Sequence, residues 1–148
     1  SEQDCARLAE AIVALPPWSQ MGYSAEAMTR FLAARDDGAR RYVIEVDGAP
    51  AGAVSIRYPW LLGPYVELLA ILPASQGRGL GAAVLNWLAQ EASRLEARNL
   101  WVCASRGNAS ALRFYQRHGF EETAALPDLV ADGFEDILLR RTLFQSFS

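Results

Sequence analysis

The 148-residue sequence is the size of one globular domain, and its hydrophobic fraction of 51% is enough to build a core. Its 14 basic and 17 acidic residues give a net charge of −3, so the chain lacks the broad basic surface that nucleic acid requires. The longest apolar stretches, such as 66–72, are far shorter than the roughly 20 residues of a transmembrane helix, so we expect no membrane partner and a cytoplasmic location. Two distant cysteines, Cys5 and Cys103, and a single histidine, His118, show no metal-ligand spacing, so we expect no metal site.

The N-terminal part of the chain predicts two helices. Residues 4–15 carry apolar side chains three or four positions apart, which is typical of an amphipathic helix, and Pro16 and Pro17 end it. A second helix begins after Ser24, a good N-cap residue, and ends near the glycine in 36–38.

Three strands are predicted next. Residues 41–46 and 51–58 are rich in β-branched side chains and flank the turn signal at 47–50, so they predict an antiparallel hairpin. Residues 65–72 are almost wholly apolar, as expected of a strand covered on both faces, and Pro73 ends it.

The rest of the chain alternates helix and strand patterns. Together with the hairpin, this order predicts a single α/β domain over residues 1–148, with a mixed sheet that is partly antiparallel and partly parallel. The predicted elements are a helix at 79–97, a strand at 100–105, a helix at 108–118 and strands at 120–125 and 135–143.

A glycine-rich turn at 73–82 lies between a buried strand and the long helix. Free backbone N–H groups and the positive end of the helix dipole meet at such a turn and favour anions. Gly77, Gly79 and Gly81 let the backbone approach a phosphate, and Arg78 adds a positive charge. The turn therefore predicts a phosphate-bearing ligand, although glycines also serve a tight turn that binds nothing.

The same turn formally matches the dinucleotide fingerprint G-x-G-x-x-A at Gly77, Gly79 and Ala82, with Glu96 about 20 residues further on. We reject this interpretation because Glu96 falls inside the predicted helix. Four further residues, 73–76, also separate the strand from the first glycine. The turn lacks the Gly-Lys-Ser/Thr of a nucleotide P-loop as well.

Two motifs in the right order resemble the GCN5-related N-acetyltransferase (GNAT) superfamily. The first is Gln76-x-x-Gly79-x-Gly81 after an apolar strand, and the second is the segment 108–120, NASALRFYQRHGF. The matching stretch runs over about 42–120. The resemblance implies two N-terminal helices and a central, mostly antiparallel mixed sheet with flanking helices. It also implies transfer of the acetyl group of acetyl-CoA to a primary amine of a small molecule or peptide, by direct attack in a ternary complex.

The resemblance further implies how the coenzyme is held. The amides of the turn would bind its pyrophosphate, and the free edge of the strand would pair with the pantetheine arm like an added strand. The backbone N–H near Leu69 would stabilise the oxyanion. The residues assigned to the coenzyme are Leu69, Ile71, Leu72, Gln76, Gly77, Arg78, Gly79, Gly81, Ala82, Asn108 and Tyr115.

Two residues are predicted to be catalytic. The resemblance places the hydroxyl of Tyr115 beside the coenzyme sulfur as general acid, and the alternative is a packed tyrosine. Glu67 is the one carboxylate in an apolar strand and is the candidate base, while a solvent-facing strand residue or an ordered water are the alternatives. Asp132, Glu135 and Asp136 could instead receive a cationic amine, although a solvated loop explains them better.

Two other reactive residue types receive structural interpretations. His118 lies in the last turn of a predicted helix, where a cation suits the dipole, so we expect surface capping. Cys103 lies between small apolar neighbours and is expected to be a core residue, without an acyl-cysteine intermediate.

Aromatic residues in two places suggest an acceptor pocket. The segment 58–65 and the residues Trp18, Met21 and Tyr23 could wall it, which favours a small amine acceptor, although core or interface packing also explains them. The apolar tail 143–147 is a candidate homodimer contact. A non-catalytic acyl-CoA-binding module on the same fold stays open as the alternative function. A third hypothesis, a dinucleotide-binding oxidoreductase domain, predicts binding of a nicotinamide cofactor, and we expect a titration to exclude it.

Overall fold

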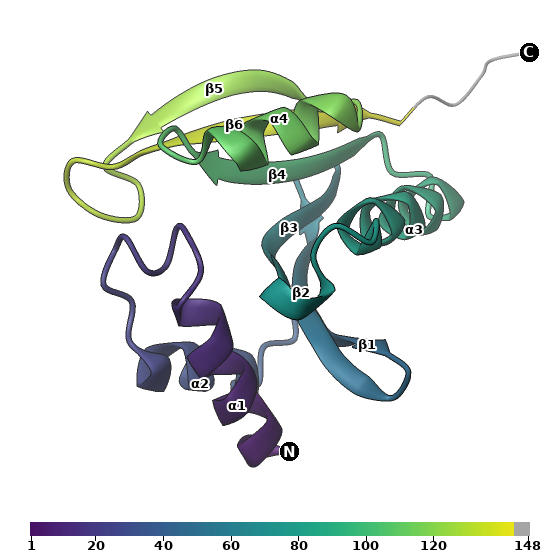
Figure 1. Ribbon diagram of the computed structural model, residues 1–148. Helices are drawn as coiled ribbons and strands as arrows, with labels where there is room; N and C mark the ends of the chain where they lie inside the picture. The colour runs from purple at the N-terminus through teal and green to yellow at the C-terminus, as the bar shows by residue number, and fades with distance from the viewer. Residues whose placement is uncertain (144–148) are drawn as a thin grey trace, which may run out of the picture.

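The computed structural model describes residues 1–143, whose helices and strands follow the predicted order (Figure 1). The dimer contact predicted for 143–147 therefore lies almost wholly outside the described residues. Within residues 1–143, no helix is long and apolar enough to cross a membrane. The elements are α1 (Glu2–Val13), α2 (Ala25–Ala33), β1 (Ala39–Val46), β2 (Ala49–Trp60), β3 (Gly63–Ile71), the 3₁₀ turn Pro73–Ser75, α3 (Leu80–Arg94), β4 (Asn99–Ser105), α4 (Ala109–Arg117), β5 (Glu121–Pro127) and β6 (Glu135–Thr142).

The strands form one six-stranded sheet in the order β1-β2-β3-β4-β6-β5. Every neighbouring pair is antiparallel except β3 and β4, which are parallel. The mixed, mostly antiparallel sheet predicted from the sequence is thus confirmed.

The hairpin of β1 and β2 is tighter than its sequence suggests. Val46 pairs with Ala49, so the turn consists of Asp47 and Gly48 alone, and both have positive φ angles, of 52° and 79°. Such a two-residue turn matches the twist of antiparallel strands, and Asp-Gly is one of the pairs that adopt it readily.

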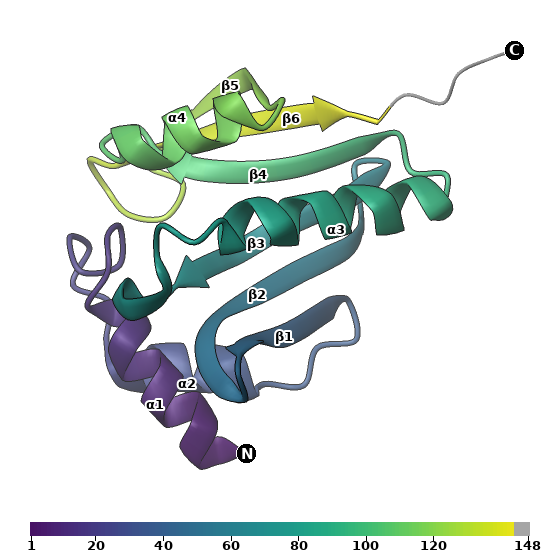
Figure 2. The ribbon, with the colours of Figure 1, turned by 45° about the vertical axis from the view of Figure 1, so that its right-hand side comes forward.

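Two hydrophobic cores pack against the sheet, one on each face. The ribbon in Figure 2 shows α3 in front of β3 and α4 beside β4. The larger core joins α3 and α4 to one face, where Val54 and Ile56 of β2 contribute. The smaller core joins α1 and α2 to the other face, where Ala53 contributes. The neighbours Ala53 and Val54 alternate between the two cores as strand geometry requires.

A β-bulge at Glu67 interrupts this alternation in β3. Ser55 pairs with Leu68 and Ile56 pairs with Val66, so Glu67 is an extra residue without a partner of its own. As a result Val66 packs in the larger core and Leu68 in the smaller one, although they are two positions apart. The bulge also bends β3 at the level where its contact with β4 ends.

Strands β3 and β4 separate soon after they meet. Their paired residues are Tyr65 with Trp101 and Val66 with Val102. Beyond these pairs the two strands no longer pair with each other, although β3 stays paired with β2 and β4 with β6. The two ribbons diverge toward those ends in Figure 2.

The N–H of Leu72 is donated to the carbonyl of Ala51 on β2, at 2.8 Å. Because backbone groups alternate in direction along a strand, those of Leu69 and Ile71 face the gap between β3 and β4. The gap thus has a strand edge on one side that is free to pair with another extended group.

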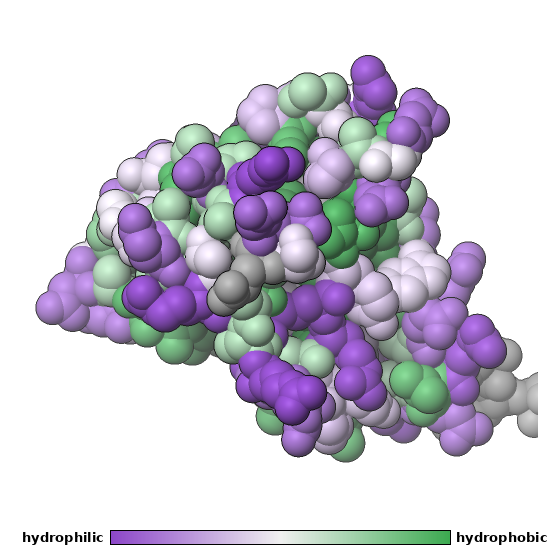
Figure 3. Space-filling view, turned by 90° about the horizontal axis from the view of Figure 1, so that it is seen from below, coloured by the Kyte–Doolittle hydropathy of each residue, from purple (hydrophilic) through white to green (hydrophobic). Residues whose placement is uncertain are grey.

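The outer surfaces of the N-terminal helices are polar. Figure 3 shows the molecule from below the view of Figure 1, and hydrophilic residues dominate that face, with small scattered hydrophobic patches. Exposed residues of α1 include Gln3, Arg7 and Glu10, whereas Leu8 and Ile12 are buried. The helix is therefore amphipathic, as its apolar spacing predicts.

Candidate active site

A cleft of about 1060 Å³ opens where β3 and β4 separate. Its walls come from the α1–α2 connection, β3, the glycine-rich turn, the start of α3, the end of β4, α4 and the start of β6. It brings together most residues assigned to the coenzyme from the sequence, namely Leu69, Ile71, Gln76, Gly77, Gly79, Gly81, Ala82, Asn108 and Tyr115.

Two of the assigned residues lie elsewhere. Leu72 packs against the smaller core, and Arg78 is exposed and does not line the cleft. The side chain of Arg78 could reach a ligand only from the rim, so the prediction of an anion at this turn now depends on its backbone groups.

The glycine-rich turn presents those backbone groups to the cleft. Gly77 and Gly79 have φ angles of 78° and 75°, in the left-handed region that favours glycine. Gly79 is the N-cap of α3 and supplies no side chain to its first N–H groups, and the first turn of the helix carries no acidic residue. Free N–H groups at a helix N-terminus on a cleft form a suitable place for phosphate.

Gly81 is a glycine for a different reason from the one the sequence suggested. A Cβ there would lie 2.9 Å from Cζ of Phe114, whereas its φ is not in the left-handed region. The residue therefore permits close packing of α3 on α4, and that packing holds the turn beside the helix that carries Tyr115.

The side chain of Gln76 fixes the turn to the strand edge. Its Nε2 donates a hydrogen bond of 2.9 Å to the carbonyl of Ile71. This bond uses one acceptor that faces the gap, so the N–H and carbonyl of Leu69 and the N–H of Ile71 remain available to a ligand that lies along β3.

Tyr115 lies inside the cleft on α4 and is buried, with the rings of Phe114 and Phe120 in edge contact. Burial, and then the neighbouring Cys103, raise the pKa of Tyr115 to about 12. The phenol therefore keeps its proton at neutral pH and can donate it. Asn108 caps α4 and accepts the N–H of Ala111 at 3.2 Å, as its position in the sequence predicts.

Glu67 faces the cleft with a side chain that is only 12% exposed, so the solvent-facing alternative is wrong. Its Oε1 accepts a hydrogen bond of 2.7 Å from Ser55, and its Oε2 accepts one of 2.8 Å from Nε of Arg57. Arg57 also pairs with Asp36 at the end of α2. The carboxylate is thus fixed and partly neutralised, and its role as a base stays a prediction.

This arrangement makes Arg57 a stabilising residue. We expect Arg57→Leu to lower the free energy of unfolding by about 1–3 kcal/mol, because the buried carboxylate of Glu67 would lose its charged donor. Urea unfolding at pH 7 measures the change. In Arg94→Leu, which removes the exposed pair with Glu91, a loss of no more than about 1 kcal/mol is expected. If the two substitutions lowered the free energy of unfolding equally, the ion pair of Arg57 with Glu67 would not have the stabilising effect assigned to it.

Cys103 and Tyr65 lie next to Glu67 on the same face of the sheet. Cys103 is half-buried and lines the cleft, so its assignment to the core is wrong. Burial raises the pKa of both the Cys103 thiol and the Tyr65 phenol. A thiol that keeps its proton is a poor nucleophile, which supports a reaction without an acyl-cysteine.

Asp136, which a solvated loop was thought to explain, is also part of the cleft. It opens β6 opposite Ser105, the last residue of β4, and burial raises the pKa of its carboxyl. Sequence reasoning gave it no preference over Asp132 and Glu135, although its place just before the apolar run 137–139 was a signal that it belongs to a strand.

The two aromatic segments behave differently. Trp18, Met21 and Tyr23 line the cleft, whereas the segment 58–65 contributes only Tyr65. Trp60 stacks on Tyr65 at 4.7 Å between ring centroids and contacts Trp101 edge-on, so it packs against the sheet instead of walling a pocket.

The structure differs from the sequence predictions at His118, which is not a surface residue, and at Glu96, which is not helical. His118 is the C-cap of α4, as predicted, but it is half-buried and lines the cleft together with Arg117. Glu96 follows α3 in a turn with φ 59° and is not part of the helix. It is still unsuited to a dinucleotide, because the 15-residue helix places it about 22 Å from the glycine-rich turn.

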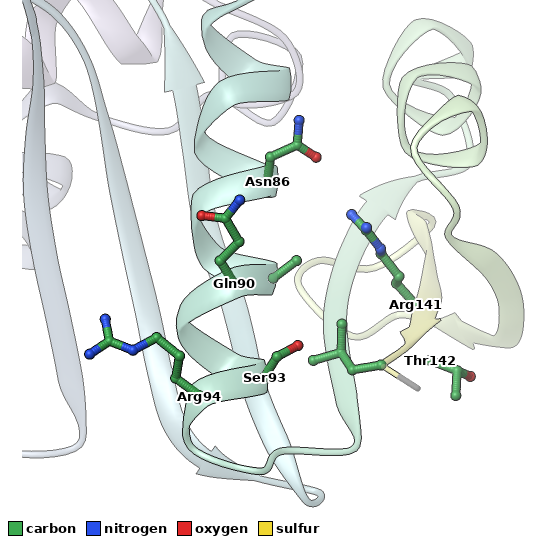
Figure 4. A pocket seen from close by; sticks show the side chains of 8 residues that line it. Asn86, Gln90, Ser93, Arg94, Arg141 and Thr142 are labelled. Atoms are coloured by element: carbon green, nitrogen blue, oxygen red, sulfur yellow. The ribbon is translucent and has the colours of Figure 1, made fainter. Parts of the chain in front are cut away.

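A second groove, of about 700 Å³, lies between α3 and the end of β6. In Figure 4, Asn86 and Ser93 point from α3 toward β6, and Arg141 points back toward α3. Its lining contains neither a carboxylate nor an aromatic ring, and Arg94 and Arg141 are its charged groups. It therefore lacks the acid and base chemistry present in the cleft.

The profile of the acetyltransferase (GNAT) family matches residues 7–120, well over half of the chain. The chain belongs to the GNAT family. A GNAT family acetyltransferase from Elizabethkingia anophelis with acetyl-CoA bound has the same fold, with a TM-score of 0.70 and 18% identity over 90% of this chain and 89% of that one. The resemblance seen in the two sequence motifs is thus confirmed.

Two curated relatives are similar in sequence. An uncharacterised N-acetyltransferase of Methanocaldococcus jannaschii is 32% identical over 99 residues, which cover 66% of this chain and 63% of the relative. The streptothricin acetyltransferase of Streptomyces lavendulae is 30% identical over 87 residues, which cover 57% of this chain and 46% of the relative. The chain spans less than two thirds of the length of either GNAT relative.

Proposed function

We propose that this GNAT protein is an acetyl-CoA-dependent N-acetyltransferase that acts on a primary amine of a small molecule or peptide. The observation that carries the proposal is the cleft between β3 and β4, with free amides of the glycine-rich turn at one end and the protonated phenol of Tyr115 inside. The name of the Streptomyces lavendulae relative, which acts on streptothricin, supports a small-molecule acceptor.

Binding would use the free edge of β3. An extended pantetheine arm can pair with the backbone groups of Leu69 and Ile71, as an added strand would. The phosphates then reach the N–H groups at the start of α3, where Arg117 and His118 line the same cleft. Arg117 can add a positive charge for the phosphates, and Glu67 and Asp136 are the carboxylates of the same cleft.

The transfer needs four events at the reacting atoms. The neutral amine attacks the thioester carbonyl, and the N–H of Leu69 can donate to the oxyanion that forms. The C–N bond forms in this attack. The C–S bond breaks when the oxyanion collapses, and the departing thiolate takes the proton of Tyr115. The proton lost by the amine passes to Glu67 or to water. No covalent enzyme intermediate is required.

The first test is ligand binding followed by thermal unfolding. We expect acetyl-CoA and CoA to raise the Tm and NAD to leave it unchanged, because only a ligand of the folded state stabilises it, by about 2.7 kcal/mol at a concentration 100 times its Kd. A screen of amines by release of free thiol follows. If no CoA species changes the Tm, the glycine-rich turn serves only as a turn and the proposed function fails.

Two properties expected from the sequence stay predictions. They are the cytoplasmic location and a homodimer. Sedimentation at several protein concentrations would test the second, and a monomer mass at every concentration would contradict it.

A further inference from the structure

Asp136 differs from the other carboxylate of the cleft in having no partner. Within residues 1–143, no ion pair or hydrogen bond engages its side chain, whereas Glu67 is held by Ser55 and Arg57. The adjacent Glu135 is also occupied, since it accepts from Nε of Arg106 at 3.1 Å. Asp136 is therefore the one cleft carboxylate of the described chain whose negative charge is uncompensated.

The position of Asp136 places this charge on the acceptor side. Cys103 pairs with Leu138 and Ser105 pairs with Asp136, so Asp136 and Cys103 share the face of the sheet that α1 and α2 pack on. Tyr65 lies on the same face, opposite Arg57. The glycine-rich turn and Tyr115, in contrast, belong to the α3 and α4 side of the cleft.

The strand itself brings no cation to Asp136. Arg140 points to the same face of β6, but it is four residues further along, about 13 Å at the usual rise of a strand. Its guanidinium lies 5.9 Å from the centroid of the Trp101 ring instead. No ion pair within residues 1–143 engages Asp136, so its carboxylate is free to pair with a positive group of a ligand.

The cleft that contains this carboxylate also has apolar and aromatic walls. Trp18, Met21 and Tyr23 line the cleft from the α1–α2 connection, and Val130 lines it from the loop before β6. A cleft that offers both an aromatic wall and a free carboxylate suits a ligand that combines an ammonium group with an apolar body.

We propose that Asp136 binds the ammonium group of the acceptor, and that the acceptor is an amine on an apolar or aromatic body without a carboxylate beside the amine. The proposal rests on the proposed function, because it names the acceptor class of the same cleft. A free amino acid would bring its own carboxylate into a cleft that already holds Asp136 and Glu67, and like charges repel in a partly desolvated site. A simple amine has no such carboxylate, and in an amino-acid amide or a peptide N-terminus a neutral amide takes its place, so these ligands avoid the repulsion.

Three probes with one ring system test the inference: tryptamine, tryptophanamide and tryptophan. Their binding to the CoA-saturated protein at pH 7 is measured by calorimetry, which needs no turnover. We expect tryptamine and tryptophanamide to bind at least tenfold more tightly than tryptophan. Equal affinity for all three, or no binding of tryptamine, would overturn the proposal.

Asp136→Asn tests the residue itself. We expect it to weaken tryptamine binding about tenfold and to abolish most of the preference over tryptophan, with the affinity for CoA unchanged. The matched control is Asp132→Asn, since Asp132 is exposed and does not line the cleft. Unchanged tryptamine binding in Asp136→Asn would exclude the role of Asp136.

Thermal unfolding without ligand separates a binding role from a structural one. Burial raises the pKa of Asp136, so its charged form destabilises the free protein at neutral pH. We expect the Tm of ligand-free Asp136→Asn to rise, whereas a carboxylate with a structural partner would give a lower Tm. Failure to bind any CoA species would refute the proposed function. Equal binding of the three probes would refute only the role of Asp136 in selecting the acceptor.

Discussion

Tyr115→Phe is expected to lower kcat by about 10²- to 10⁴-fold and to leave the Kd for acetyl-CoA nearly unchanged, because only the proton donor to the thiolate is lost. The ring stays in its contacts with Phe114 and Phe120, so the fold should be retained. Free-thiol release measures kcat, and calorimetry measures the Kd. The matched control is Tyr42→Phe, whose hydroxyl lies on β1 outside the cleft.

The pH profile adds a second readout for Tyr115. Its pKa of about 12 lies above the ordinary value of 10, so the acid form persists as the pH rises through 10 and is lost only near 12. We therefore expect kcat to show no descending limb from this residue below about pH 11. Unchanged turnover in Tyr115→Phe would exclude the general acid. A protein that binds acetyl-CoA but acetylates no amine would favour the non-catalytic acyl-CoA-binding module.

Gly63→Ala is expected to lower the free energy of unfolding by about 3 kcal/mol or more, because a Cβ at this position would lie 1.9 Å from the carbonyl oxygen of Asn99. The two backbones cannot separate freely. The side chain of Asn99 donates to the carbonyls of Leu61 and Leu62, and the indole of Trp101 donates to Leu61 at 3.0 Å.

Urea unfolding compares Gly63→Ala with Gly107→Ala. The nearest atom to a Cβ at Gly107 is Oγ of Ser105 at 3.8 Å, an ordinary contact, and its φ is not in the left-handed region. We expect a change within about 0.5 kcal/mol for this control. If both variants have the same stability, the close approach at Gly63 is not a constraint on the fold.

The local patterns predicted the elements well, and long-range pairing explains what they missed. The order of helices and strands, the glycine-rich turn and the position of Tyr115 follow from residue spacing over short windows. The bulge at Glu67 does not, because it depends on the register between β2 and β3. The Glu67–Arg57 pair depends on that register too.

The cleft position of Asp136 shows the same limit. It arises because β6 pairs antiparallel with β4, which lies about 30 residues earlier in the chain. No window of the sequence contains both strands. The role of Gly81 was misjudged for a similar reason, since its close neighbour Phe114 lies on another helix.

The short pairing of β3 with β4 is also expected to affect how readily the protein is degraded. A half-sheet of β1–β3 is joined to a half-sheet of β4–β6 by two register pairs, by the hydrogen bonds from Asn99 and Trp101 to the turn between β2 and β3, and by the larger core. We expect the sheet to open first along this line, where hydrogen exchange would be fastest among its strands. A coenzyme paired with the edge of β3 would bridge the gap between β3 and β4 and would stabilise the sheet against this opening. The supply of acetyl-CoA in the cell would then set how often the chain is exposed to proteases, as well as how fast it works.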